Sequence, residues 1–385
     1  MKRFVVLALG PAVLLAFGIY TFASHGGRIY RRTPTTTPAT TPTTTAVVRR
    51  IAPAAAKPKP KPKRKPKPPA RFTFVGGGDI ALRGAADPAV LAGLARFLSG
   101  ADVAIGNLEG TLAVDGAPRC DQSADSGCFT FRAAPAWAAA LRGVGFTDLN
   151  VANNHALDYG PVAQAETLAA LGRAGLAHDG LPHEITYLTA GSVKVAVIGA
   201  APYHWAQELL DVPGSQALVR RAAKRADVVI VYMHAGAEGA TANHVTGREE
   251  TFLGEDRGNP EAFAHAMVNA GADLVFASGP HVVRAMQWYH GRLIAYSLGN
   301  LVSVGTLSTS GAGGETALLK VILDATGRFV AGSVIPLRLA GSGSPVYDPA
   351  HTAVEAIRAL SQADFPGSAV QLSPSGKIAP RRPRE

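Results

Sequence analysis

The chain has 385 residues, an apolar fraction of 47% and a formal net charge of +10. This length and apolar content suffice for a sizeable core in one large domain or two small ones. Residues 1–71 hold 15 of the 38 Lys and Arg and none of the 28 Asp and Glu, which leaves 23 basic and 28 acidic residues from position 72 onward. An acidic folded part argues against nucleic acid as a partner, because nucleic-acid-binding domains carry their basic surface on the fold itself.

Residues 1–26 are predicted to form a cytoplasmic tip and a transmembrane signal anchor. Positions 4–23 carry no charge, and about 20 residues at ~1.5 Å rise each span a hydrocarbon core of ~30 Å. A cleavable signal peptide is the alternative, because Thr21-Phe22-Ala23 is a weak cleavage site. Three arginines between positions 28 and 32 blur the positive-inside signal. We expect a single-pass protein of the cell membrane with its domain on the extracytoplasmic side, or a secreted protein if the signal is cleaved.

Residues 27–70 are expected to form a disordered stalk. Positions 33–45 mix Thr with Pro and Ala, and positions 57–69 are nearly a Lys-Pro repeat, a composition that cannot bury a core. Proline fixes φ and the lysines repel one another, so a semi-rigid spacer with much polyproline II is predicted. The basic run at 57–67 either contacts anionic wall polymer or lipid head groups, or serves solubility alone.

Residues 71–345 carry the alternation of short apolar strands and helical patterns that is typical of α/β folds. In chain order, the predicted elements are strand 71–75, helix 88–98, strand 102–105, helix 134–142, strand 144–151, helix 161–174, strand 193–199, helix 216–225, strand 227–233, helix 260–270, strand 273–276, strand 293–296 and a hairpin at 316–339 that turns at Thr326-Gly327. Gly76-Gly77-Gly78 is predicted to break the first strand in a tight turn. Residues 346–385 are expected to add a helix and, from Ser373, a basic disordered tail.

Cys120 and Cys128 are the only cysteines of the chain. A disulfide between them is the natural interpretation outside the cytosol, and closing so short a loop stabilises a fold by roughly 2 to 3 kcal/mol in the chain-entropy model. Ligation of a metal by the two cysteines alone is the alternative. It has less support, because no histidine or third cysteine lies near them in the sequence.

Polar side chains of ligand type follow six of the predicted strands. They are Asp79, Asn107, Glu109, Asn153, Asn154, His155, Asp158, His234, Glu238, His281 and Asn300. Ligands of open α/β sheets gather outside the carboxyl ends of the strands, and this mixture of oxygen and imidazole groups suits Mn, Fe, Zn or Mg. For the central cluster alone, a helix cap and an ordinary turn histidine explain 153–155 equally well. With neither a nucleophile elbow nor a P-loop in the sequence, the six clusters together predict a divalent-metal site of hydrolytic type.

These residues lie in motifs that resemble, in the same order, those of the CapA family of bacterial capsule-synthesis proteins. The motifs are Gly78-Asp79, Gly106-Asn107-Leu108-Glu109, the run at 152–160, His234-x-Gly236-x-Glu238, Pro280-His281-Val282 and the run at 296–300. The resemblance spans about 72–339. It implies a metallophosphatase-like four-layer α-β-β-α sandwich with two mixed β-sheets. It also implies a role in making, exporting or anchoring an anionic polymer, which is poly-γ-glutamate in the best-known members.

The resemblance also assigns roles to single residues. The metal ligands it implies are Asp79, Glu109, Asn154, His234 and His281. The catalytic group it implies is His155, with Asn154 and Asp158. Residues that support the ligands or contact polymer are Asn107, Asn153, Glu238, Ser278 and Asn300.

The chain departs from the family at positions 277–281. The usual segment is Gly-His-His-Pro-His, whereas this chain has Ala-Ser-Gly-Pro-His, so two imidazoles are missing. The hydroxyl of Ser278 is a far weaker donor to a transition metal than an imidazole nitrogen. We therefore expect one tightly held ion at most.

Two classes of function remain open from the sequence. The first is a non-catalytic factor that binds or guides an anionic envelope polymer, with membrane synthase subunits as further partners. The alternative is a metal-dependent phosphoesterase or other hydrolase acting on a cell-envelope substrate. The missing imidazoles favour the first class.

Deleting residues 1–70 should leave the thermal midpoint of unfolding unchanged, because their composition cannot contribute to a core. Calorimetry of the full chain and of residues 71–385 tests this. A midpoint lower by more than about 5 °C in the shorter chain, roughly 1 kcal/mol or more for a domain of this size, would mean that the stalk packs on the fold.

Overall fold

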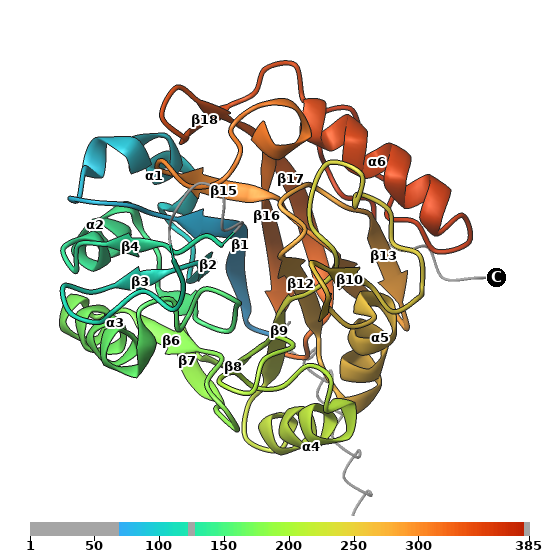
Figure 1. The fold of residues 1–385 in the computed structure, drawn as a ribbon. Helices are drawn as coiled ribbons and strands as arrows, with labels where there is room; N and C mark the ends of the chain where they lie inside the picture. The colour runs from blue at the N-terminus through green and yellow to red at the C-terminus, as the bar shows by residue number, and fades with distance from the viewer. Residues whose placement is uncertain (1–68, 122–127, 381–385) are drawn as a thin grey trace, which may run out of the picture. The chain divides into compact units, whose positions relative to one another are not determined.

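The computed structural model describes residues 69–121 and 128–380 (Figure 1). The predicted anchor at 4–23 and nearly all of the predicted stalk lie outside the described residues. Among the residues that are described, no helix combines the length and the apolar character needed to cross a membrane.

Two mixed β-sheets form the centre of the domain (Figure 1). The first has eight strands in the order β18 (Ser344–Tyr347), β17 (Phe329–Ala340), β16 (Glu315–Asp324), β1 (Arg71–Ala81), β2 (Val103–Leu108), β5 (Asp148–Asn150) and β6 (Ala177–Asp179), with β15 (Asn300–Ser303) also paired to β1. The second has six strands in the order β13 (Met286–Tyr289), β14 (Arg292–Ala295), β12 (Leu274–Ser278), β9 (Val228–His234), β8 (Val193–Ala200) and β7 (Thr186–Ala190). The prediction of two mixed sheets is confirmed.

Three layers of apolar side chains hold the sheets and helices together. Residues of both sheets, among them Phe74 and Phe276 with ring centroids 5.1 Å apart, share the core between the sheets. The outer face of the first sheet is covered by η1 (Pro88–Leu94), α1 (Ala95–Leu98), α2 (Trp137–Val144) and α3 (Gly160–Ala174). The outer face of the second is covered by α4 (Val212–Ala223) and α5 (Pro260–Ala270). The order of layers is therefore helix, sheet, sheet, helix.

Short two-stranded pieces and caps complete the described fold. The pairs are β3 (Thr111–Leu112) with β4 (Arg132–Ala133), and β10 (Thr251–Phe252) with β11 (Glu255–Asp256); η2 (Gly311–Gly314) precedes β16. Helix α5 shows why helices begin where they do: the Asn259 side chain accepts a hydrogen bond from the Ala262 amide, and Pro260 fills the first turn. The predicted strand 144–151 is too long, because Val144 ends α2 and β5 begins at Asp148.

The prediction that three glycines break the first strand is wrong. Strand β1 runs through them to Ala81, and none of the three has a positive φ. They are required by close packing instead. A Cβ at Gly76 would lie 2.9 Å from the Phe276 ring, one at Gly77 2.5 Å from Leu301, and one at Gly78 1.8 Å from the Gly299 carbonyl oxygen. Only glycine lets other chain segments approach β1 this closely.

The predicted hairpin is confirmed, whereas the predicted disorder from Ser373 is wrong for residues 373–380. The hairpin turns after Asp324, whose Oδ1 accepts hydrogen bonds from the Thr326 amide and hydroxyl. The carboxyl-terminal segment returns to β17, where Lys377 forms a β-bridge with Ser333. Ile378 is buried in the core between the sheets. Helix α6 (Thr352–Asp364) also contributes buried residues to that core, so apolar burial outweighs the polar composition of this segment.

Gly78→Ala should destabilise the domain by about 3 kcal/mol, the upper end of the range for overpacked cores, because the new methyl group would collide with a backbone carbonyl that cannot rotate away. The matched control is Gly172→Ala. That glycine is exposed in α3 with nothing within 4 Å of its Cβ position, so alanine there should stabilise by roughly 0.5 to 1 kcal/mol. Urea unfolding measures both, and equal stability of Gly78→Ala and the natural chain would contradict the prediction.

Candidate metal centre

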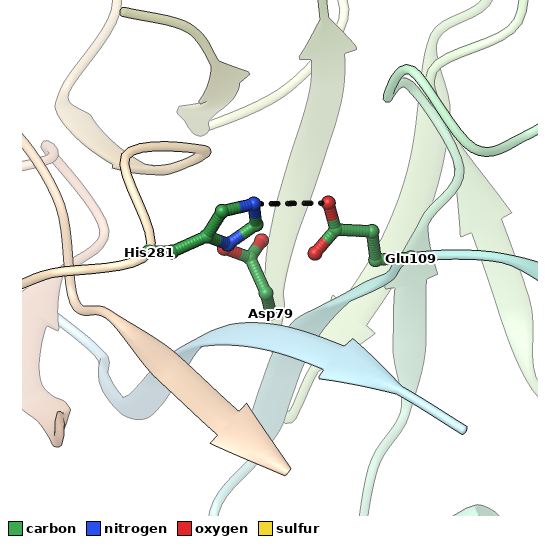
Figure 2. A group of neighbouring side chains, drawn as sticks. All are labelled: Asp79, Glu109 and His281. Atoms are coloured by element: carbon green, nitrogen blue, oxygen red, sulfur yellow. Dashed lines mark hydrogen bonds and ion pairs between the residues drawn. The ribbon is translucent and has the colours of Figure 1, made fainter. Parts of the chain in front are cut away.

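Asp79, Glu109 and His281 converge at the carboxyl ends of β1, β2 and β12 (Figure 2). Each offers one ligand atom, and these atoms all lie within 4.8 Å of one another. Both carboxylate oxygens of Glu109 are buried and accept no hydrogen bond from any described residue. A buried carboxylate without a donor requires a cation or a proton. The orphaned Glu109 carboxylate and a donor set of two carboxylates and an imidazole therefore fit a divalent metal.

Asp79 is held in place from three sides. Its Oδ1 accepts a hydrogen bond of 2.8 Å from Asn107 Nδ2, and its Oδ2 accepts one of 3.2 Å from the Gly279 amide and lies 3.1 Å from His281 Nδ1. Burial alone would raise the pKa of Asp79, but hydrogen bonds and charge interactions with His234 and His281 outweigh it and lower this pKa below its usual range. The lowered pKa keeps Asp79 in the ionised form that a metal ligand requires.

Glu109 and His281 depend on each other electrostatically. Burial raises the pKa of Glu109 well above its usual range, although the charge of His281 opposes this. Burial alone would lower the pKa of His281, but Glu109, Asp79 and Glu238 raise it well above its usual value. The Nε2 atom of His281 lies 3.6 Å from Glu109 Oε1 and 3.4 Å from Glu238 Oε2. Without a metal ion, the protonated ring of His281 is thus the positive charge that these carboxylates surround.

An amide network behind the centre fixes the ligands. Asn107 Oδ1 accepts hydrogen bonds from Asn150 Nδ2 at 2.7 Å and from Asn153 Nδ2 at 3.0 Å, while Asn107 Nδ2 donates to Asp79. Asn300 Oδ1 lies 3.0 Å from His281 Nδ1. Orienting a ligand through its far side in this way is the usual task of residues around a metal. Asn150 was absent from the predicted site, although it lies only two residues before the motif at 152–160.

His234 and Asn154 form a pair beside the three converging ligands. His234 Nε2 lies 3.0 Å from Asn154 Oδ1 and 3.9 Å from Glu109 Oε1. Its Nδ1 faces away from this pair, 3.5 Å from Asp79 Oδ1 and 3.3 Å from Ser278 Oγ. Ser278 thus contacts the rear of His234. The structure places all five predicted ligands together but puts only three of them in the converging group.

His155 projects into the same space from the loop after β5. Its Nδ1 lies 2.7 Å from Asp158 Oδ2, its ring stacks on Phe131 with centroids 4.1 Å apart, and its Nε2 lies 4.0 Å from Glu109 Oε1. The Asp158 carboxylate also accepts from the Phe131 amide and from Arg119 Nε. Asp158 therefore fixes the tautomer of His155, with Nδ1 as the donor and Nε2 directed towards the centre.

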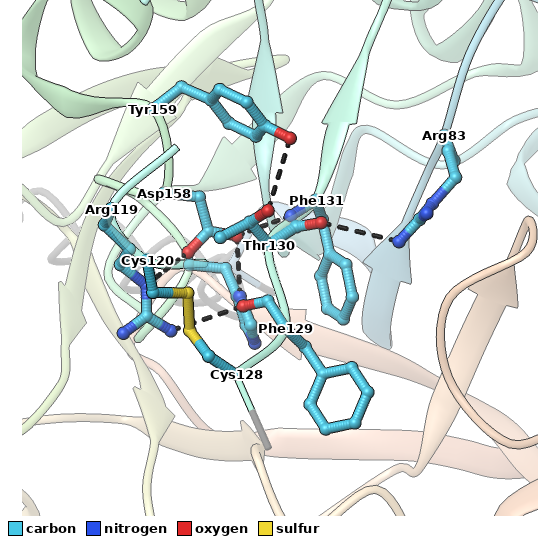
Figure 3. Close-up of a disulfide and its surroundings, with 10 residues drawn as sticks. Arg83, Arg119, Cys120, Cys128, Phe129, Thr130, Phe131, Asp158 and Tyr159 are labelled. Carbon is cyan, nitrogen blue, oxygen red and sulfur yellow. Dashed lines mark hydrogen bonds and ion pairs between the residues drawn. A yellow bond between two sulfur atoms is a disulfide. The ribbon is translucent and has the colours of Figure 1, made fainter. Parts of the chain in front are cut away.

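The disulfide between Cys120 and Cys128 is confirmed (Figure 3), and ligation of a metal by these cysteines is excluded by that bond. Arg119 precedes the first cysteine and binds Asp158, while Phe129 follows the second. The disulfide therefore joins the two chain segments that support His155.

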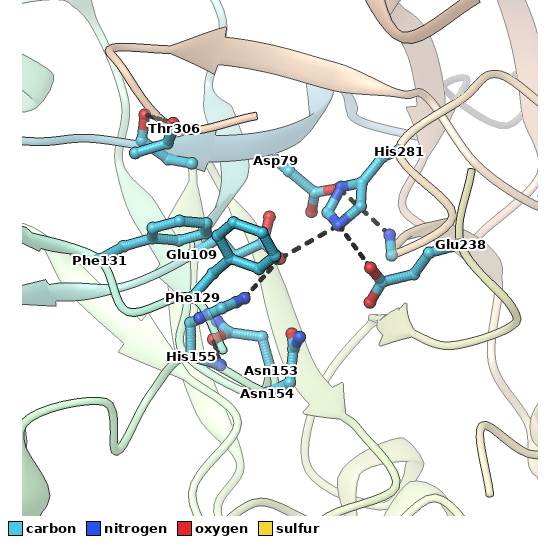
Figure 4. Close-up of polar contacts among 12 residues, drawn as sticks. Asp79, Glu109, Phe129, Phe131, Asn153, Asn154, His155, Glu238, His281 and Thr306 are labelled. Carbon is cyan, nitrogen blue, oxygen red and sulfur yellow. Dashed lines mark hydrogen bonds and ion pairs between the residues drawn. The ribbon is translucent and has the colours of Figure 1, made fainter. Parts of the chain in front are cut away.

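A pocket of about 350 Å³ opens over the candidate metal centre (Figure 4). His155, His281 and Glu238 line its base, together with Arg257, a buried residue that sequence reasoning missed. Phe129 and Leu253, which are 65% and 78% exposed, line its mouth. No motif marks Arg257, because it lies in a polar stretch between β11 and α5.

The fold and these side chains define a protein of the α/β sandwich class that gathers carboxylates and imidazoles at strand ends, where metal ions bind in such folds. The chain belongs to the bacterial capsule synthesis protein PGA_cap family, which matches residues 73–304. The resemblance carried by the sequence motifs is thereby confirmed.

Three relatives illustrate the membership. The chain is 31% identical over 229 residues to the capsule biosynthesis protein CapA of Bacillus anthracis, covering 54% of this chain and 51% of the relative. It is 30% identical over 183 residues to the PGA biosynthesis protein CapA of Bacillus subtilis, covering 42% and 44%. It is 28% identical over 275 residues to a probable polyglutamine synthesis accessory protein of Mycobacterium tuberculosis, covering 62% and 66%. The chain spans about half the length of the two Bacillus relatives.

Solved structures show similarity of fold alone. A 5'-nucleotidase precursor from Thermus thermophilus matches with a TM-score of 0.43 and 15% identity, over 76% of this chain and 59% of that one. GAP50, the anchor in the inner membrane complex of Plasmodium, matches with a TM-score of 0.39 and 12% identity, over 75% and 95%.

Asp148 and Asp179 form a buried acid pair on the neighbouring strands β5 and β6. None of their four carboxyl oxygens accepts a hydrogen bond from a side chain of the described residues. Burial raises the pKa of Asp148 to about 7, and burial together with the charge of Asp148 raises the pKa of Asp179 well above its usual range. The raised pKa values therefore favour retention of a proton by the pair over ionisation of both carboxyl groups.

Stability should fall as the pH rises from about 4 through 7 and above, because the folded state keeps a proton that an unfolded aspartate has already lost. The slope is up to about 1.4 kcal/mol per pH unit for one proton. Asp179→Asn should reduce this loss, since its amide donates to Asp148 at every pH. Thermal midpoints at pH 6 and pH 9 measure the effect, with the exposed Glu355→Gln as control. An unchanged difference between the two pH values in Asp179→Asn would refute the retained proton.

Proposed function

We propose that this protein is an accessory factor in the synthesis, export or anchoring of an anionic capsule or wall polymer of poly-γ-glutamate type. In this proposal the domain engages an anionic group of the polymer at one divalent ion held by Asp79, Glu109 and His281. Membership in the PGA_cap family supports the role. The observation that carries the metal site is the buried Glu109 carboxylate, both of whose oxygens lack a donor among the described residues.

The residues of the pocket have separate tasks in this proposal. Asp79, Glu109 and His281 hold the ion, which is Mn, Fe, Zn or Mg, and a bound ion of this kind attracts and polarises an oxygen anion. His155 Nε2 offers a hydrogen-bonding group at the same opening. A volume of about 350 Å³ is at the small end for a ligand site. It therefore suits a terminal or single group of a polymer rather than a folded segment.

A metal-dependent phosphoesterase or other hydrolase of the cell envelope is the second candidate, and one observation favours it. His155 has its Nδ1 fixed by Asp158 and its Nε2 directed at the metal centre. When both of its ring nitrogens are protonated, an imidazole oriented in this way can donate a proton from Nε2 to a leaving group. The same geometry also suits a hydrogen bond to a bound anion, so turnover separates the two functions.

The proposal includes a location. The domain lies on the extracytoplasmic side of the cell membrane, anchored through residues 4–23 and near membrane synthase subunits. The disulfide between Cys120 and Cys128 supports an oxidising compartment. The uncharged run at 4–23 supports the anchor.

Glu109→Gln should abolish tight metal binding and reduce polymer formation, because it removes the ligand charge while keeping the side-chain volume. Metal content by mass spectrometry and surface polymer in cells that lack the natural chain measure the two effects. Glu355→Gln is the matched control at an exposed helix position. Metal-free natural protein would contradict the proposed metal site.

The hydrolase is tested on the same preparations. Phosphodiester turnover with added Mn or Zn should be low or absent, and His155→Ala should leave it unchanged. Robust turnover that His155→Ala abolishes would place the hydrolase first.

A further inference from the structure

A second set of ligand-type atoms lies beside the proposed ion. His234 Nε2 is 3.0 Å from Asn154 Oδ1 and 3.9 Å from Glu109 Oε1. Glu109 is therefore shared between two groups: Asp79 and His281 on one side, and Asn154 and His234 on the other. A carboxylate between two such groups is the arrangement in which paired metal ions some 4 Å apart are held.

The guanidinium of Arg257 lies against this second group. Its Nη2 is 3.5 Å from His234 Nε2, and its Nη1 donates to Glu238 Oε1. The side chain is fully buried, and its Nε finds no acceptor among the described residues. A Cβ at Gly279 would lie 3.4 Å from Arg257 Nη2, an ordinary contact distance, so the guanidinium packs directly against the loop after β12.

We propose that Arg257 is a built-in cation that takes the place of a second metal ion. Its guanidinium supplies a fixed positive charge next to Glu109 and excludes a divalent ion from His234 and Asn154. The centre then holds one exchangeable metal and one permanent cation. The ligand class that such a pair suits is a carboxylate or phosphate group, which contacts the metal and the arginine together.

The charges of the pocket support this assignment. Glu238 lines the pocket, and the fully buried Asp79 and Glu109 lie next to the lining residue His281. Buried carboxylates of this kind need a cation close by. Arginine remains charged at every pH at which the protein is folded, and its planar fork fits a carboxylate. A divalent ion at His234 would lie within a few ångströms of that positive charge and would be repelled. Removing the charge should therefore open the second group to metal.

This inference rests on the metal site of the proposed function, and metal stoichiometry tests the two separately. The full chain and its variants are titrated with Mn²⁺ by calorimetry, and bound ions are counted by mass spectrometry. The natural chain should bind one ion. Arg257→Gln should bind two, Arg257→Gln combined with His234→Ala should return to one, and Arg257→Lys should remain at one. Arg119→Gln is the matched control, because Arg119 lines the same pocket but pairs with Asp158 away from His234.

Each result has a defined meaning. Two ions in the natural chain, or one ion in correctly folded Arg257→Gln, would overturn the role of Arg257 and leave the metal site intact. No ion in the natural chain would overturn both proposals. If Arg257→Gln fails to fold by circular dichroism, electron paramagnetic resonance of the Mn²⁺-loaded natural chain decides instead. An isolated six-line signal supports one ion beside a fixed cation, and an exchange-coupled pair refutes it.

Discussion

The candidate metal centre depends on one backbone contact, the approach of β1 to the segment before β15. The amide of Asp79 donates a 3.0 Å hydrogen bond to the Gly299 carbonyl. Residue 78 must be glycine, because a Cβ there would collide with the same carbonyl oxygen. The contact sets Asp79 opposite Asn300 in one direction and Asn107 in the other. Because the carboxyl-terminal parts of β1 and β2 lie beside the first residue of β15 here, these polar side chains meet at one point without long loops.

Bringing these carboxyl groups together removes them from water, and the cost of this desolvation determines which of them stay charged. Asp79 and Glu109 are completely buried, and Glu238 lies nearby. Carboxylates in such a place remain ionised only when cations stand beside them. In the protein alone, the protonated ring of His281 and the guanidinium of Arg257 supply that charge. A divalent ion can replace the proton of His281 more readily than it can replace the guanidinium of Arg257, because arginine does not release its proton.

Sequence reasoning found the parts of the site that follow from strand order and missed those that follow from packing. Asp79, Glu109 and His281 each lie four residues after the end of an apolar run, so a general rule about strand ends places them together. Arg257 comes from a polar stretch with no periodicity, and only the tertiary fold shows that it turns inward. The glycines at 76–78 are a similar case. Their local preference for turns is real, but the neighbours that require them are Phe276, Leu301 and Gly299, far away in sequence.

The acidity of the folded part limits how a polyanion can bind to it. From residue 72 onward, 28 acidic residues face 23 basic ones, so the domain as a whole repels such a polymer. Salt screens this repulsion beyond about 10 Å at 0.1 M, and within that range local charge decides. The base of the pocket is where the positive groups gather: the fully buried Arg257 and the partly exposed His281. In the proposed function, the base of the pocket therefore attracts an anionic group of the polymer despite the net negative charge of the domain, and it does so one group at a time.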